Sequence, residues 1–189
     1  KKNLLLEMNK MLESLYTDKD NAKYREEKLK QIREEKEKQE KEDLQKKKGF
    51  SNLRGKLPWP VNGTIINDYG INNNTGIKEK KLWIEIKTNK NEKVKSVFDG
   101  IVAKIDFNPI YNSYIIIDHG NGYSTLYANL DDQSIQVSEQ DYIESQTVIA
   151  NTLNSNNSGN NSYGLLYFMI FELANNEELK NYNPKEWIE

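Results

Sequence analysis

Histidine and cysteine are nearly missing from this chain of 189 residues, which has one histidine and no cysteine. The lack of cysteine excludes disulfide bonds and thiolate metal sites. A single imidazole cannot supply a catalytic zinc site, which needs several histidine or carboxylate ligands around the metal. No apolar run approaches the roughly 20 residues that cross a bilayer. The leucines of KKNLLLEMNKM are too few for an export signal, so no signal peptide is expected within this chain.

A strong excess of one charge is also absent. The chain has 27 basic and 29 acidic residues, which give a formal net charge of −2. This balance provides no overall attraction to nucleic acid or to an anionic membrane, and a nucleic-acid partner is not expected. Charged residues make up 30% of the chain and hydrophobic residues 36%. Such a composition is polar for a compact protein, so part of the chain is expected to be solvated.

Residues 1–48 contain almost no glycine or proline and have helical character. Apolar residues recur there at spacings of three and four, which predicts one helical stripe: Leu5, Met8, Leu12 and Leu15. Polar residues interrupt the stripe and are able to cap a second helix, in which Glu and Lys alternate around a single apolar pair, Leu29 and Ile32. Two interpretations stay open: a solvated spacer helix, or part of a coiled coil whose stripe meets a partner helix.

The helical segment is expected to end at Gly49 and to be followed by a linker at residues 49–55. Valine, isoleucine, tyrosine and turn residues dominate residues 56–189. Expected strands lie at 82–87, 141–150 and 165–173. No long amphipathic helix intervenes, so the sequence predicts a mainly β, compact antiparallel domain preceded by an α-helical or coiled-coil segment.

Three turn or loop signals punctuate the β region. Asp99–Gly100 and Asn121–Gly122 supply the positive φ of tight turns, and each predicts a β-hairpin. The composition of residues 152–163, rich in Asn and Ser, predicts a mobile polar loop.

Four segments of residues 56–189 match the motifs of one known domain family, in the same order along the chain: LPWPVNGTIINDYG, VKSVFDGIVAKI, IIIDHGNGYSTLYANL and LLYFMIFEL. Together they resemble the LytM-type, or lysostaphin-like, zinc endopeptidase domain, which cuts peptidoglycan peptides. The resemblance implies the compact antiparallel β fold of that family.

The resemblance breaks at the catalytic positions. Catalytic members bind zinc through a His-x-x-x-Asp pair and the second histidine of a His-x-His pair, with a further histidine near the reacting water. Those positions fall here on Lys81 and Glu85, on Leu165 and Tyr167, and on Asn129. A protonated lysine donates hydrogen bonds and cannot ligate a metal. The resemblance therefore implies a domain without catalytic residues or a zinc cofactor.

The strand at 165–173 suggests what replaced the metal site. Leu165 and Tyr167 alternate onto one face, which carries histidines in the enzymes. We expect an apolar partner-binding groove lined by Lys81, Glu85, Tyr127, Asn129, Leu165 and Tyr167. Such a groove suits an amphipathic helix or an extended peptide. Two alternatives stay open: the groove has collapsed into core, or the helix at 21–47 folds back and masks it.

A helical segment before a histidine-depleted LytM domain is similar to the EnvC-type murein hydrolase activators. That resemblance implies a non-enzymatic activator of peptidoglycan amidases in cell division and daughter-cell separation, located in the periplasm or otherwise outside the cytoplasm. The implied partners are a cell-wall amidase, whose regulatory helix enters the groove, an FtsEX-type division complex that contacts the helical segment, and peptidoglycan itself. Alternatives are a peptidoglycan-binding or scaffold module and a residual hydrolase. Gln140 and Gln146 replace the family's turn glycines, which leaves those loop shapes open.

Overall fold

The computed structural model describes Glu7, Lys10 and residues 19–39, 49–72, 79–155, 162–173 and 178–189. The helical elements whose bounds fall within the described residues are the α-helix α2 (Lys19–Gln39) and three 3₁₀ turns, η1 (Phe50–Leu53), η2 (Asp132–Ser134) and η3 (Pro184–Glu186). The strands are β1 (Gly63–Asn67), β2 (Gly70–Asn72), β3 (Glu79–Lys81), β4 (Ile84–Thr88), β5 (Lys93–Lys95), β6 (Gly100–Asn108), β7 (Asn112–Gly120), β8 (Tyr123–Leu130), β9 (Tyr142–Ile143), β10 (Val148–Asn151), β11 (Asn154–Ser155), β12 (Tyr163–Leu173) and β13 (Leu179–Tyr182).

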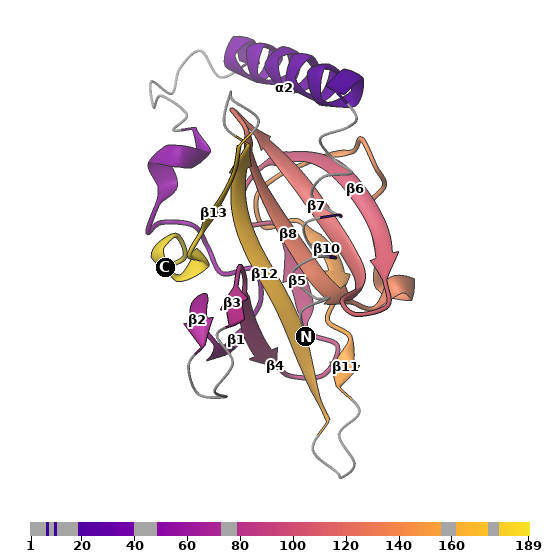
Figure 1. The fold of residues 1–189 in the computed structure, drawn as a ribbon. Helices are drawn as coiled ribbons and strands as arrows, with labels where there is room; N and C mark the ends of the chain where they lie inside the picture. The colour runs from indigo at the N-terminus through magenta and orange to yellow at the C-terminus, as the bar shows by residue number, and fades with distance from the viewer. Residues whose placement is uncertain are drawn as a thin grey trace.

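One antiparallel sheet forms the body of the molecule, with strand order β1-β4-β12-β8-β7-β6-β9 and with β11 and β13 added alongside β12. The long strand β12 lies between β4 and β8 and runs through the centre of the sheet (Figure 1). The predicted strands at 82–87 and 165–173 correspond to β4 and β12, whereas 141–150 is divided between β9 and β10. The predicted mainly β, antiparallel fold is confirmed.

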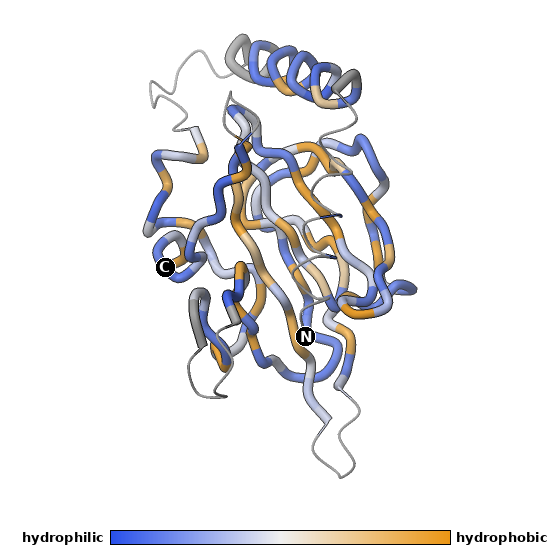
Figure 2. The backbone as a smooth tube through the Cα atoms, in the orientation of Figure 1, coloured by the Kyte–Doolittle hydropathy of each residue, from blue (hydrophilic) through white to orange (hydrophobic). Residues whose placement is uncertain are grey.

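Each face of this sheet has its own apolar cluster. The inner face carries Ile84 and Ile86 of β4 and Phe168 of β12, which pack in a core that also contains the small β5–β10 sheet. The outer face carries Leu126 of β8 and Met169 of β12 in a second cluster. Apolar residues follow the central strands, while α2 is hydrophilic over most of its length (Figure 2). The alternation of side chains along β12 thus supplies both faces.

The two predicted hairpins have different outcomes. Asn121 and Gly122 have φ of 55° and 82° and join the paired strands β7 and β8, as predicted. Asp99 and Gly100 form no hairpin, because β5 pairs with β10 and the chain then passes to β6 in the other sheet. Glycine is needed there for packing: a Cβ at Gly100 would lie 2.4 Å from the carbonyl oxygen of Asp118. The Asp99–Gly100 prediction was therefore wrong.

Two glutamines adopt the backbone conformation that favours glycine. Gln140 and Gln146 have φ of 72° and 66°. The Gln140 N–H donates to the carbonyl of Val102 at 2.8 Å, and that of Gln146 donates to the carbonyl of Ser96 at 2.8 Å. These hydrogen bonds hold both loops in a left-handed turn without glycine.

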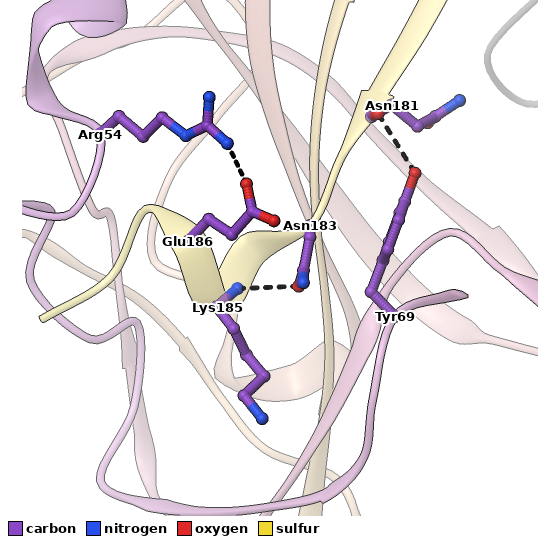
Figure 3. Close-up of polar contacts among 6 residues, drawn as sticks. All are labelled: Arg54, Tyr69, Asn181, Asn183, Lys185 and Glu186. Carbon is purple, nitrogen blue, oxygen red and sulfur yellow. Dashed lines mark hydrogen bonds and ion pairs between the residues drawn. The ribbon is translucent and has the colours of Figure 1, made fainter. Parts of the chain in front are cut away.

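The start and the end of the β region are fastened together. Leu57 donates its N–H to the carbonyl of Trp187 at 2.8 Å and accepts a hydrogen bond from Glu189 at 2.9 Å. Beside this bridge, Arg54 pairs with Glu186 and the Tyr69 hydroxyl donates to the carbonyl of Asn181 at 3.2 Å (Figure 3). The two ends of the β region therefore close on each other.

The predicted linker at 49–55 is packed against this closure. Phe50 is only 2% exposed and stacks on His119 and on Trp187, with ring centroids 4.7 and 5.2 Å away. Gly49 has φ of −56° and precedes η1, so it lacks the left-handed conformation of a helix C-cap. The predicted stripe at 5–15 and part of the predicted loop at 152–163 lie outside the described residues.

Candidate partner-binding groove

The outer face of the sheet brings most of the predicted site residues together. Glu85 of β4 is directly opposite Tyr167 of β12, and Tyr167 is opposite Ala128 of β8. Leu165 is opposite Lys87 on the same face. The strand register, rather than proximity in the sequence, builds the site.

An ion pair fills the first part of the site. The ammonium of Lys81 lies 2.7 Å from one carboxylate oxygen of Glu85, and the amide of Asn67 donates to the other at 2.6 Å. The side chains of Lys81 and Glu85 are only 18% and 14% exposed. Both carboxylate oxygens are engaged, and a positive charge stands where a metal would need a lone pair. These residues do not fit a zinc ion.

Tyr167 belongs to an aromatic cluster on the same face. Its ring packs edge-to-face against Trp83 at 6.2 Å and against Tyr111 at 6.0 Å, and those two rings contact each other at 5.7 Å. Burial raises the pKa of the Tyr167 phenol, and the negative charge of Glu85 raises this pKa further. The phenol is therefore protonated at neutral pH and is a poor substitute for an imidazole ligand.

Trp83 and Tyr111 are site residues that the sequence did not single out. Both are almost fully buried. Burial raises the pKa of Tyr111, with smaller contributions from the charges of Tyr167 and Glu7. Tyr111 lies in the turn that joins β6 to β7, and no sequence spacing links it to Tyr167. Trp83 is two residues from Lys81 in KKLWIEI. Its large aromatic ring so close to a predicted site residue could have identified it from the sequence.

Asn129 braces the end of the groove. It has φ of 66°, and its amide donates to the carbonyl of Leu165 at 2.6 Å while its oxygen accepts from the amide of Asn112 at 2.7 Å. Asparagine tolerates the left-handed conformation better than most residues do. Because both ends of its side chain are engaged, Asn129 fastens β8 to β12 and is not free to contact a ligand.

Tyr127 was expected in the groove and lies on the opposite face of the sheet. It is fully buried in the inner core, where its ring packs 5.3 Å from that of Phe168 and its hydroxyl accepts a hydrogen bond from the N–H of Val97 at 3.0 Å. Residues two apart normally share a face, but the β7–β8 register shifts beside Asn129. The bulge interrupts the alternation of side chains at Asn129, so Tyr127 stays on the inner face. The prediction that Tyr127 lines the groove was therefore wrong.

Leu165 is partly exposed on the outer face, beside a cation–aromatic pair. The ammonium of Lys87 lies 4.5 Å above the ring centre of Tyr163. The predicted site residues that share the outer face are therefore Lys81, Glu85, Leu165 and Tyr167, and the rings of Trp83 and Tyr111 pack against Tyr167. We keep the name outer-face groove for this set of residues.

The single histidine lies away from this groove. His119 is 1% exposed, donates from Nδ1 to the carbonyl of Asp99 at 2.9 Å, and has Nε2 2.8 Å from the hydroxyl of Thr125. Burial lowers the pKa of His119 to about 4. The ring is thus neutral at physiological pH and fixed by hydrogen bonds. Among the residues described here, no three His, Cys, Asp or Glu side chains lie together in a group able to hold a metal.

The predicted masking helix is elsewhere. The described part of that segment, α2, contacts β6 and β7 and lies at the end of the sheet where β7 turns into β8 (Figure 1). Asn129 and Leu165 lie toward the opposite end. The prediction that residues 21–47 cover the groove was therefore wrong for α2. Within the part of the chain that the structure covers, no helix has the length and apolar character to span a membrane.

Comparison with known proteins gives relatives that share this domain. The chain is 28% identical over 140 residues to the murein hydrolase activator EnvC of Escherichia coli, which covers 74% of this chain and 30% of EnvC. It is 26% identical over 88 residues to the cell division protein DipM of Caulobacter vibrioides, which covers 46% of this chain and 14% of DipM. The chain therefore spans less than a third of either relative.

The fold also resembles that of solved structures. The solution structure of lysostaphin aligns with a TM-score of 0.53 and 16% identity over 71% of this chain and 53% of that chain. This likeness confirms the lysostaphin-like fold. Residues 80–182 match the family described as peptidase family M23, a match that includes β4, β8 and β12. The chain belongs to peptidase family M23.

Proposed function

We propose that this chain activates cell-wall amidases without itself cleaving peptidoglycan, by binding the regulatory helix of the amidase in the outer-face groove. The observation that carries the proposal is the Lys81–Glu85 ion pair at the position where family members hold zinc. The similarity to EnvC, a murein hydrolase activator, supports the same function. DipM, named as a cell division protein, supports a role in division.

The groove offers two kinds of contact to such a helix. Leu165 and the exposed part of Tyr167 present an apolar strip, while Lys81, Glu85 and Lys87 line its β4 side with charge. An amphipathic helix fits this division, because its apolar stripe meets the strip and its polar flank meets the charges. Binding shifts the amidase toward its open state only by the difference in affinity for the two states.

The proposal includes a location outside the cytoplasm and contact of the helical segment with an FtsEX-type division complex. Both rest on the resemblance to EnvC-type activators. Peptidoglycan is a further proposed ligand, since the family acts on the cell wall.

Leu165→Lys tests the groove directly. Because Leu165 is partly exposed, a lysine there is expected to leave the domain folded while placing a charge in the apolar strip. We expect loss of amidase stimulation in a dye-release assay on labelled peptidoglycan. Phe107→Lys is the matched control, because Phe107 is 60% exposed and pairs with Ser113 away from the groove.

Normal amidase stimulation by the Leu165→Lys variant would contradict binding of the amidase helix in the outer-face groove. Retention on intact sacculi by both variants, with no stimulation of any amidase by the parent chain, would instead identify a peptidoglycan-binding scaffold.

A further inference from the structure

We propose that α2 is clamped to the β domain by a row of cationic side chains, so that helix and domain form one rigid unit. This differs from the free spacer and from the coiled-coil segment that the sequence suggested. This docking of α2 does not depend on the proposed amidase partner.

Three basic side chains of α2 reach the domain. Arg25 Nε lies 3.4 Å from a carboxylate oxygen of Asp118, and its side chain is only 7% exposed. Lys28 donates to the carbonyl of Gln140 at 2.8 Å, and Arg33 donates to the carbonyl of His119 at 2.8 Å. Their spacing places all three on one side of the helix. A polar helix thus acquires a directional docking face without a broad apolar stripe.

An apolar contact lies at the centre of this face. Leu29 is 1% exposed, although it belongs to a helix that is otherwise mostly solvated. The backbone of Gly120 has φ of 80°, and a Cβ there would lie 3.1 Å from the guanidinium of Arg33. Glycine therefore serves two needs at this position: the left-handed turn and the close approach of Arg33.

The same turn anchors the chain again after α2. Phe50 of η1 stacks on the ring of His119 at an interplanar angle of 10°. Residues 118–120 thus receive Arg25 and Arg33 from α2 and, through His119, Phe50 from η1. α2 and η1 are therefore both fastened to this one turn.

Beside this docking face, α2 also carries side chains that are largely in solvent. Lys30 and Glu34 form an ion pair 4.0 Å apart with side chains 75% and 57% exposed. Tyr24 is 52% exposed. The contrast between Arg25 and Lys30, five residues apart, provides a matched pair of basic positions for an experiment.

Hydrogen exchange in the full chain tests the clamp, because an isolated helix of this length is marginal in water and its amides exchange quickly. Arg25→Ala and Leu29→Ala are expected to speed exchange of the α2 amides at least about tenfold, equivalent to about 1.4 kcal/mol. Lys30→Ala is expected to leave exchange unchanged. Alanine is the best helix former, so faster exchange in Arg25→Ala reports lost docking and not lost helix propensity.

The amides of β7 and β8 are measured in the same samples and are expected to keep their protection, which shows that the domain stays folded. The proposal is overturned if α2 in the parent chain exchanges as fast as an unprotected peptide. It is equally overturned if α2 exchanges at the parent rate in both Arg25→Ala and Leu29→Ala.

The absence of cysteine permits a second, independent test. Spin labels at Glu27→Cys on α2 and Lys93→Cys on β5 are expected to give one narrow distance distribution that broadens when Arg25→Ala is added. A broad distance distribution in the labelled chain that keeps Arg25 would contradict a rigid unit of α2 and the β domain.

Discussion

The two faces of strand β12, which is eleven residues long, differ in their exposure to solvent. Leu166, Phe168 and Ile170 are fully buried in the inner core, while Leu165 and Tyr167 on the outer face keep part of their surface in contact with solvent. Because neighbouring residues point to opposite faces, the outer face can lose every catalytic side chain without disturbing the inner one. The residues of the outer face can therefore change while the fold is kept.

The largest expected effect comes from comparing neighbouring leucines on these two faces. Leu166→Ala is expected to lower the free energy of unfolding by about 2–5 kcal/mol, because it leaves a cavity in the inner core. Leu165→Ala is expected to cost about 1 kcal/mol or less, because part of this side chain is already in water. Urea unfolding of both variants gives the two values. Equal costs would contradict the separation of the faces.

A pH titration of stability probes the inner side through His119. Its pKa of about 4 in the folded chain lies below the ordinary value of 6.5. The unfolded chain therefore binds more protons between these two values, and stability rises with pH across that window. We expect about 3 kcal/mol to be lost as the pH falls from about 6.5 to about 4.

The control for this titration is His119→Gln, which removes the ionisable ring. The variant is expected to be less stable at neutral pH and to show a flatter dependence between those pH values. A parent chain whose stability is constant across the window contradicts a buried neutral histidine.

Asn129 fastens β8 to β12. Its variants separate the contribution of backbone conformation to stability from that of hydrogen bonding. Asn129→Ala is expected to cost about 2–3 kcal/mol, since it loses the hydrogen bonds to Leu165 and Asn112 and puts alanine, which tolerates positive φ less well than asparagine, at this position. Asn129→Gly removes the same hydrogen bonds but accepts positive φ, so its cost is expected to be about 1 kcal/mol lower. Thermal unfolding of both variants measures the difference; equal melting temperatures would show that backbone strain is unimportant there.

The smallest expected effect lies at the exposed rim of the outer face. Lys87→Ala removes a cation–aromatic contact with Tyr163 and is expected to change stability by about 0.5–1 kcal/mol. Amidase stimulation is the more sensitive measurement, since the charge flanks the proposed path of the partner helix. A change in stability above that range would show that Lys87 supports the fold.

Some features were predictable because one local rule decides them. Strict alternation fixed the faces of β12, and Asn121–Gly122 adopts positive φ for reasons internal to the turn. The family motif also placed Lys81, Glu85 and Tyr167 on one face, where the structure brings them together.

Other features depend on long-range packing. A bulge at Asn129 interrupts the alternation that would have placed Asn129 and Tyr127 on one face, and pairing of β5 with β10 removed the hairpin expected at Asp99–Gly100. Burial of Phe50 depends on His119 and Trp187, which lie far along the chain. No local pattern carries that information, because it arises from which strands pair and which side chains meet.

We propose that this member of peptidase family M23 acts through binding and not through zinc hydrolysis. Dye release from labelled peptidoglycan measures this directly, with the chain alone, with each of a panel of cell-wall amidases, and with a chelator added to the chain alone. We expect no release by the chain alone and faster release when the chain is added to a responsive amidase. Chelator-sensitive release by the purified chain alone would contradict it.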